Sequence, residues 1–158
     1  MENHAGGISI IAFVVALAVS IGYYQFIYIP EANAKPIIKE EVLNPTDSTI
    51  ITIVEGSSLE SNPDFFVKKD ERATLEISNM VIWENNDTIP HTVTSDNGYK
   101  DAYSGLFDSR ARQELGGDAF VMPGKTYEFL FTKPGQYAYH CEPHPWMQGS
   151  IEIVENFA

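Results

Sequence analysis

Short runs rich in Val, Ile, Thr, Tyr and Phe follow one another from about residue 48 to the last residues of the chain. Pro-Gly, Asn-Asp and Asn-Gly pairs separate these runs, and such pairs are typical of turns between strands. The roughly 110 residues involved are the size of one domain with its own core. The pattern therefore predicts one all-β domain, a sandwich or a barrel, over residues 48–158.

Two of these runs, 126–132 and 136–141, alternate with period two. Because successive side chains of a strand point to opposite faces, the aromatic residues at 127, 129 and 131 share one face. In the second run Cys141 shares a face with two tyrosines, and His140 lies on the other face. We expect Cys141 to point into the core and His140 to point outward. Further strands are predicted at 74–77, 81–83 and 150–154.

A different pattern occupies the N-terminal part, where residues 8–29 form a run of 22 residues without a charge. About 20 apolar residues in a helix span the ~30 Å hydrocarbon core of a bilayer. Tyr23, Tyr24 and Tyr28 gather near the end of the run, where aromatic hydroxyl groups favour the membrane interface. We therefore expect one N-terminal transmembrane helix within residues 1–30, with residues 8–29 in the membrane.

A secretory signal peptide is the alternative, because Ala32-Asn33-Ala34 has the small-x-small form of a cleavage site. The apolar region of a signal peptide is about 7–15 residues long and follows a positive start, whereas residues 1–4 contain no Lys or Arg. An uncleaved anchor is the preferred prediction. Either alternative exports the downstream domain, and the polar, proline-containing segment 31–47 is expected to be a stalk.

The charge of the exported part restricts its partners. Residues 35–158 contain 20 acidic and 10 basic side chains, for a formal net charge of −10. Such a surface disfavours nucleic acid and would attract a basic patch on a partner protein. Cys141 is the only cysteine, so no disulfide bond forms within the chain.

The candidate chemistry lies in residues 139–147, YHCEPHPWM. Cys141, His144 and Met147 are spaced C-x-x-H-x-x-M, so one tight loop can aim a thiolate, an imidazole and a thioether at a single point. His91, in the segment 89–93, is the candidate fourth ligand. Two His, one Cys and a weak axial Met are the ligands of blue-copper electron-transfer sites. Each residue alone has an ordinary explanation in packing or on the surface, and only the combination predicts a metal centre.

Landmarks around these residues resemble the cupredoxins, in particular the amicyanin and plastocyanin branch with a short ligand loop. Pro-His-x-Val at 90–93, Met-Pro-Gly at 122–124 and Lys-Pro-Gly-Gln-Tyr at 133–137 precede the Cys loop in the order of the family. The resemblance covers residues 74–156 and implies a Greek-key β-sandwich that binds one type 1 copper ion. It implies the ligands His91, Cys141, His144 and Met147.

The resemblance also implies that His144 is the ligand at the surface, with Trp146 beside it in a docking patch for redox protein partners. The predicted function is a carrier of single electrons between membrane-associated redox partners on the extracytoplasmic face. Four histidines are too few for an additional oxygen-reducing copper centre, so no enzymatic activity is expected. His140 is interpreted as a surface histidine. Two alternatives remain open, a copper delivery or assembly factor and an accessory cupredoxin subunit of a larger membrane enzyme.

Two features depart from the family pattern. Thr92 follows His91, where plastocyanin and amicyanin usually have an Asn that ties the two ligand loops together, and this puts the rigidity of the site in question. The stretch 96–119 is longer than a minimal cupredoxin needs, and we expect a short helix or an excursion over one face. Arg110 and Arg112 within it are interpreted as part of a solvated, charged loop.

Overall fold

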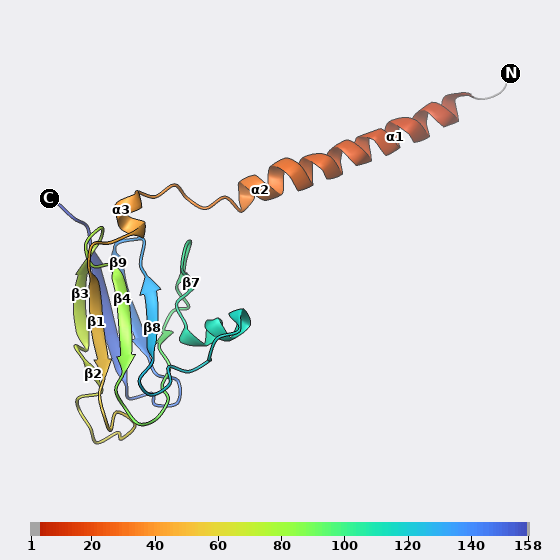
Figure 1. Ribbon diagram of the computed structural model, residues 1–158. Coiled ribbons are helices and arrows are strands. Elements are labelled where there is room, and N and C mark those ends of the chain that lie inside the picture. The colour runs from red at the N-terminus through yellow and green to blue at the C-terminus, as the bar shows by residue number, and fades with distance from the viewer. Residues whose placement is uncertain (1–3, 158) are drawn as a thin grey trace. The chain divides into compact units, whose positions relative to one another are not determined.

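The computed structural model describes residues 4–157, which belong to two compact units (Figure 1). One unit ends at Pro36, and the other begins at Ile37. The predicted stalk, residues 31–47, is therefore divided between the two units. The predicted divisions at 1–30, 31–47 and 48–158 stay a prediction.

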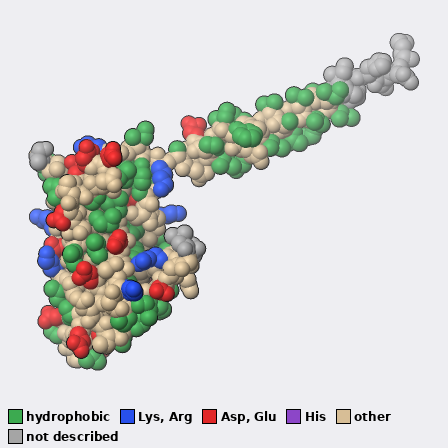
Figure 2. All heavy atoms as spheres, in the orientation of Figure 1, with side chains coloured by type: hydrophobic (Ala, Val, Ile, Leu, Met, Phe, Trp, Pro, Cys, Tyr) green, Lys and Arg blue, Asp and Glu red, His purple; other side chains and the backbone are tan. Residues whose placement is uncertain are grey.

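The N-terminal unit is helical. Helix α1 (His4–Tyr23) continues into a π-helical segment, η1 (Tyr24–Tyr28), and then into α2 (Ile29–Ala32). Pro30 has no N–H to donate within the helix, and the π-helical turn lies just before it. The apolar helix Ser9–Ala32 contains an 18-residue window with a mean hydropathy of 2.1, and hydrophobic side chains cover this helix in Figure 2. It is long and apolar enough to cross a bilayer, but a signal sequence has the same properties, so both alternatives remain.

The C-terminal unit is a β-sandwich of two four-stranded sheets. The first sheet has the order β2 (Phe66–Val67), β1 (Ser48–Ile53), β4 (Met80–Asn85) and β8 (Thr126–Leu130). The second has the order β3 (Asp70–Thr74), β10 (Gln148–Val154), β9 (Gly135–His140) and β5 (Thr94–Ser95). Strand β1 runs parallel to β4 and β10 runs parallel to β3, so strands distant in the chain are neighbours. The prediction of an all-β sandwich is confirmed.

Alternating burial along the strands builds the core between the two sheets. The residues predicted to share inward faces are all buried, namely Tyr127, Phe129, Phe131, Tyr137, Tyr139 and Cys141. The ring of Trp83, on β4, lies 5.4–5.6 Å from the rings of Phe107, Tyr127 and Tyr139. Aromatic side chains of this size dominate the energetics of a core. Cys141 therefore leaves the end of β9 directly from a tightly packed aromatic cluster.

The strand predicted at 74–77 is wrong. Thr74 ends β3, and residues 75–78 form a turn in which Glu76 has a φ of 69°. The N–H of Ser78 donates to the carbonyl of Thr74 at 2.8 Å, and the N–H of Thr74 donates to Oγ of Ser78 at 3.1 Å. A hydroxyl that bonds to the nearby backbone competes with a strand ladder, which the alternation of residue types does not reveal.

The stretch 96–119 forms both a short helix and an excursion. Strands β6 (Lys100–Asp101) and β7 (Gly105–Leu106) pair with each other, and the 3₁₀ helix η2 (Ser109–Leu115) follows. Figure 1 shows this excursion beside β8, and Arg112 donates to the carbonyl of Thr126 at 3.0 Å. Phe107 is fully buried and anchors the excursion in the core.

The short helix α3 (Glu40–Leu43) packs at the start of β1. Its Val42 is buried, and the side-chain amide of Asn79 donates to the carbonyls of Val42 and Phe131, both at 2.8 Å. Asn79 is itself fully buried, so one amide joins three segments that are far apart in the chain. This end of the sandwich lies at the opposite end of β1 from the candidate site described next.

Candidate metal centre

The loop of residues 141–147 connects β9 to β10 and is held by its own backbone. The N–H of Cys141 donates to the carbonyl of Met147 at 3.0 Å and closes the loop at its base. Within the loop, the N–H of His144 donates to the carbonyl of Cys141 at 3.1 Å, and the N–H of Met147 donates to the carbonyl of His144 at 2.9 Å. Pro143 and Pro145 further restrict the backbone on both sides of His144. The three predicted ligands of this loop are thus held within two successive turns.

His91 reaches the loop from the segment that follows β4. The side-chain amide of Asn85, the last residue of β4, donates to the carbonyls of Ile89 and Val121 at 2.8 and 2.7 Å. The backbones of His91 and Val121 exchange two hydrogen bonds of 3.2 and 2.8 Å. Asn85 and His91 are both fully buried. The position of His91 therefore depends on contacts with residues far from it in the chain.

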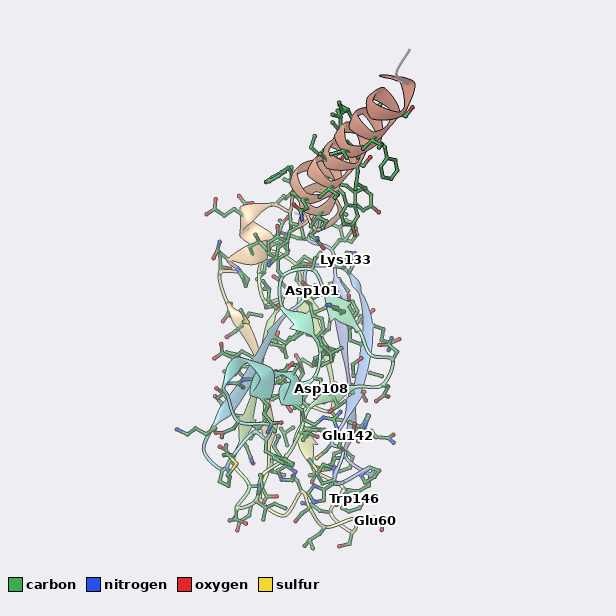
Figure 3. All side chains as sticks on the ribbon, turned by 90° about the vertical axis from the view of Figure 1, so that its right-hand side faces the viewer. Glu60, Asp101, Asp108, Lys133, Glu142 and Trp146 are labelled. Atoms are coloured by element: carbon green, nitrogen blue, oxygen red, sulfur yellow. The ribbon has the colours of Figure 1, made fainter. Side chains whose placement is uncertain are left out.

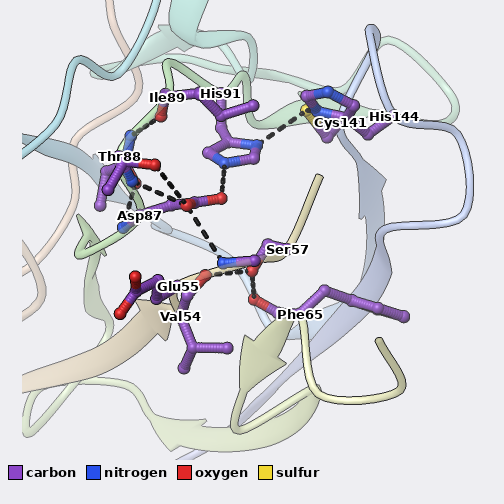
Figure 4. Close-up of polar contacts among 12 residues, drawn as sticks. Val54, Glu55, Ser57, Phe65, Asp87, Thr88, Ile89, His91, Cys141 and His144 are labelled. Atoms are coloured by element: carbon purple, nitrogen blue, oxygen red, sulfur yellow. Dashed lines mark hydrogen bonds and ion pairs between the residues drawn. The ribbon is translucent and has the colours of Figure 1, made fainter. Parts of the chain in front are cut away.

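The side chains of His91, Cys141 and His144 converge, and their donor atoms all lie within 4.8 Å of one another (Figure 4). The Sγ of Cys141 lies 3.7 Å from Nδ1 of His91 and 3.5 Å from Nδ1 of His144. A trigonal ion with ligand distances of about 2.0–2.3 Å would separate its donors by about 3.5–4 Å. His91 and Cys141 are fully buried, whereas His144 is partly exposed. The donor set and its spacing fit a single copper ion.

Met147 is fully buried in the same loop, as a weak axial ligand in this protected site would be. Its role as a ligand stays a prediction, as does the complete set of His91, Cys141, His144 and Met147. The structure brings the first three ligand atoms together over a chain separation of 50 residues.

Burial sets the protonation of two of these side chains. Burial lowers the pKa of His91 and outweighs the opposing hydrogen bond and charge of Asp87, so the imidazole is neutral and can donate a lone pair. Burial raises the pKa of the Cys141 thiol, although the N–H and hydroxyl of Thr92 act in the opposite direction. Because a thiolate is the form that binds metals, loss of the Cys141 proton must accompany binding of a cation.

Asp87 is a functional candidate that the sequence did not reveal. Its Oδ2 lies 2.9 Å from Nε2 of His91, on the side of the ring opposite Nδ1, and both side chains are almost completely buried. Burial alone would raise the pKa of Asp87, but hydrogen bonds from His91 and from the N–H groups of Gly56 and Thr88 outweigh it and lower the pKa. An acidic residue four positions before a ligand His was the available signal, but in the sequence it suggested only a turn.

Thr92 supplies the link between the two ligand loops. Its hydroxyl oxygen accepts a hydrogen bond from the N–H of Glu142 at 2.9 Å, and its own N–H donates to Sγ of Cys141 at 3.4 Å. A shorter side chain than Asn therefore connects the segment of His91 to the loop of Cys141. Although Thr92 stands where the family usually has an Asn, its hydrogen bond to Glu142 can still keep the two ligand loops rigid.

Charged side chains from other segments lie beside the outward-facing His140 of β9, next to the site. Nδ1 of His140 lies 2.5 Å from a carboxylate oxygen of Asp96, and the side chain of His140 points away from the core, as predicted. Arg110 pairs with Asp108 at 2.7 Å and with Glu142 at 2.8 Å. The guanidinium group is partly exposed, yet it links the excursion to the residue after Cys141, which the interpretation as a solvated loop missed.

Trp146 is partly buried and lies against His144. The two rings are 5.3 Å apart, and the indole N–H donates to the carbonyl of Ser57 at 3.2 Å. The predicted exposed patch is therefore in part a packing contact, because Trp146 connects the ligand loop to the turn after β1.

Comparisons with known proteins agree with this geometry. A model of the copper binding proteins of the plastocyanin/azurin family matches residues 58–154. Amicyanin from Paracoccus versutus is 28% identical over 127 residues, which are 78% of this chain and 75% of that protein. Chloroplastic plastocyanin from Hordeum vulgare is 37% identical over 82 residues, which are 51% of this chain and 44% of that protein. The chain thus spans less than half of the length of this plastocyanin.

A solved structure gives an independent likeness of fold. The structure described as a novel purple cupredoxin from Nitrosopumilus maritimus has a TM-score of 0.52 and 22% identity, over 68% of this chain and 100% of that chain. The predictions of a cupredoxin fold and of copper as the cofactor are confirmed, and the matches agree with an electron carrier rather than an enzyme. The chain belongs to the plastocyanin/azurin family of copper binding proteins.

Proposed function

We propose that this chain is a type 1 (blue) copper protein that carries single electrons between membrane-associated redox partners on the extracytoplasmic face. One observation carries the proposal: two imidazole nitrogens and one cysteine sulfur, from His91, His144 and Cys141, lie within 4.8 Å of one another in a protected site. Met147 is the proposed axial ligand. The membership of the chain in a copper-binding family supports the same assignment.

The bound ion would supply one reversible oxidation and reduction, Cu(II) to Cu(I), and the protein supplies the geometry. Electron transfer is fast when the ligands move little between the two oxidation states. The closed backbone of the 141–147 loop, the bonds of Asn85 and the link through Thr92 all oppose such movement. The burial of His91 and Cys141 excludes water from the thiolate. These features favour a carrier over a delivery factor, which must release its ion.

The visible spectrum of the full-length chain in detergent after addition of Cu(II) tests the proposal. An intense thiolate-to-copper band that bleaches with ascorbate and returns on reoxidation is expected, and Cys141→Ser should lack it. A folded protein without the band would rule out the carrier. Repeated redox cycles in the presence of a Cu(I) chelator then separate the two copper functions, because a carrier retains its ion and a delivery factor loses it.

Anchoring of the domain through residues 8–29 is the second part of the proposal. The length and hydropathy of the helix support it, and the absence of charge within the run agrees with it. The intact mass of the mature protein, purified from the membranes of the cells that make it, distinguishes the alternatives. A mass that includes residues 1–34 supports the anchor, whereas a chain that begins near Lys35 identifies a cleaved signal peptide.

Redox partners are proposed to dock where His144 and Trp146 approach the surface. Figure 3 shows Trp146 and Glu60 at the same end of the domain, and Leu59, in the same segment as Glu60, is 60% exposed. Ile77 is 41% exposed at the opposite end of β1, where its carbonyl accepts from Asp47. Electron self-exchange between two copies of this protein is a partner-free test. Leu59→Glu should slow it about tenfold or more, and Ile77→Glu should not; equal rates would exclude this surface.

A further inference from the structure

The turn that follows β1, residues 54–57, lies beside Asp87, close to the candidate metal centre (Figure 4). The hydroxyl of Ser57 lies within hydrogen-bond distance of the carbonyls of Val54 and Phe65, which share its single proton and hold the turn in place. Gly56 has a φ of +79°, a conformation that other residues rarely adopt. This backbone directs the N–H of Gly56 at Oδ1 of Asp87, at 3.1 Å. The turn therefore presents a hydrogen-bond donor to a carboxylate that is 31 residues away in the chain.

Both carboxylate oxygens of Asp87 have defined partners. Oδ1 accepts from the N–H groups of Gly56 and Thr88, at 3.1 and 2.7 Å. Oδ2 faces Nε2 of His91 at 2.9 Å. Asp87 is 4% exposed and His91 is completely buried, so water does not compete for these bonds. Two backbone donors aim the carboxylate at a single atom of the ring.

This arrangement selects one tautomer of His91. An ionised carboxylate only accepts hydrogen bonds, so the ring proton must lie on Nε2. Nδ1 then carries the free lone pair, and it is Nδ1 that faces Sγ of Cys141 at 3.7 Å. Ligand histidines in metal sites commonly hold their second ring nitrogen in this way, and the partner affects both the orientation and the basicity of the ligand.

We propose that Asp87 is a positioning residue that holds His91 in the Nε2–H tautomer and that its buried negative charge favours Cu(II) over Cu(I), which lowers the reduction potential of the site. The proposal rests on the proposed function, because His91 must be a copper ligand for the second effect. The alternative is that Asp87 only stabilises the loop before His91. A purely structural role would change stability and leave both the tautomer and the potential as they are.

The tautomer can be measured in the metal-free protein by ¹⁵N NMR of the His91 side chain. The proposal expects a proton on Nε2 and a bare Nδ1 in the wild-type protein. In Asp87→Asn the amide can donate as well as accept, so a mixture with the Nδ1–H tautomer should appear. A wild-type protein with the proton on Nδ1 would overturn the proposal, and this measurement needs no variant that folds.

The charge effect can be measured on the copper-loaded protein. At the midpoint potential of the wild-type protein, Asp87→Asn should raise the ratio of Cu(I) to Cu(II) about tenfold, which corresponds to 59 mV for one electron. Asp64→Asn removes the same charge from an exposed position in the segment between β1 and β2 and should change the ratio less than twofold. A ratio in folded Asp87→Asn within twofold of the wild type contradicts the charge effect.

Failure of the proposed function and failure of the proposed role of Asp87 give different experimental results. A wild-type protein without the blue band overturns the proposed function and with it the effect on the potential, whereas the tautomer is still decided by NMR. A normal blue band with an unchanged tautomer and potential in Asp87→Asn leaves the proposed function standing and removes the role of Asp87.

Discussion

Two loops bring the candidate ligands together, and they are held in different ways. The 141–147 loop is closed by hydrogen bonds between its own backbone groups. The segment that ends at His91 depends on outside partners instead: Asn85 bonds to Val121, and Asp87 bonds to Gly56. The geometry of the short 141–147 loop can thus be fixed largely by its local sequence. The position of His91, by contrast, depends on contacts with residues elsewhere in the domain.

The largest effect on stability and on the site is expected from replacing Asn85, because its side chain holds the segment that ends at His91. Asn85→Ala leaves the carbonyl of Ile89 and the N–H of Asp87 without their side-chain partner and removes one of the two hydrogen bonds to the carbonyl of Val121, which should lower the free energy of unfolding by about 2–4 kcal/mol. It should also weaken the blue band. Chemical denaturation and the copper spectrum measure the two effects.

Asn79→Ala is the matched control for this comparison. It removes a fully buried amide with two bonds of the same kind at the other end of β1. A similar loss of stability with an unchanged copper spectrum is expected. If Asn79→Ala weakened the band as much as Asn85→Ala, the effect on the site would reflect general destabilisation.

Asp101 is a buried carboxylate that does not contact the ligands, so it is a useful comparison for Asp87. Asp101 accepts hydrogen bonds from Tyr99, from the N–H groups of Tyr103 and Ser104, and from the N–H and hydroxyl of Thr132. Asp101→Asn should lower the free energy of unfolding by about 2–3 kcal/mol at pH 7 without a change in the copper potential. Denaturation and redox titration of the same variant check this.

The pH dependence of this effect has a definite sign. Burial would raise the pKa of Asp101, but the hydrogen bonds outweigh it and lower the pKa below the value of about 3.9 in the unfolded chain. The carboxylate therefore contributes fully above about pH 4, and its contribution is lost as the pH falls through the lower folded pKa. The difference between wild type and Asp101→Asn should shrink in that acid range, and a constant difference down to pH 2 would contradict the assignment.

The direct link between the two loops should have a smaller effect. Thr92→Val removes the hydroxyl that accepts from the N–H of Glu142 while it keeps the shape of the side chain. A loss of about 1 kcal/mol is expected, because one partly buried N–H loses its partner. Thr92→Ser retains the hydroxyl and should keep most of the stability, so thermal unfolding of the two variants separates the hydrogen bond from the packing.

The smallest effect is expected at the charged surface beside the site. Arg110→Gln breaks the pairs with Asp108 and Glu142, but the side chain of Arg110 is 41% exposed and solvent screens its charge. The change in the free energy of unfolding should be no more than about 1 kcal/mol and should decrease at high salt. A larger, salt-independent loss would mean that the excursion helps to hold the ligand loop.

Local patterns in the sequence alone predicted the orientation of side chains along the strand 136–141, the ligand loop and the N-terminal apolar helix. Period-two alternation predicted that Cys141 points inward and His140 outward, because the strand backbone itself imposes that period. The spacing of Cys141, His144 and Met147 predicted the ligand loop, since a short loop leaves few ways to arrange its side chains. The uncharged run of residues 8–29 predicted the long apolar helix for the same local reason.

Only the tertiary structure decided how the site is supported. The bond between Gly56 and Asp87 joins residues 31 positions apart, and the bond between Thr92 and Glu142 joins residues 50 positions apart. Hydrogen bonds over such separations leave no periodic trace in the sequence, because they depend on which strands become neighbours. The turn after Thr74 was missed for a different reason, because the N–H and hydroxyl of Ser78 bond to the backbone of Thr74 while the residue types of the run favour a strand. The sequence thus determined which residues could bind copper, and the packing of the sandwich determined which groups hold them.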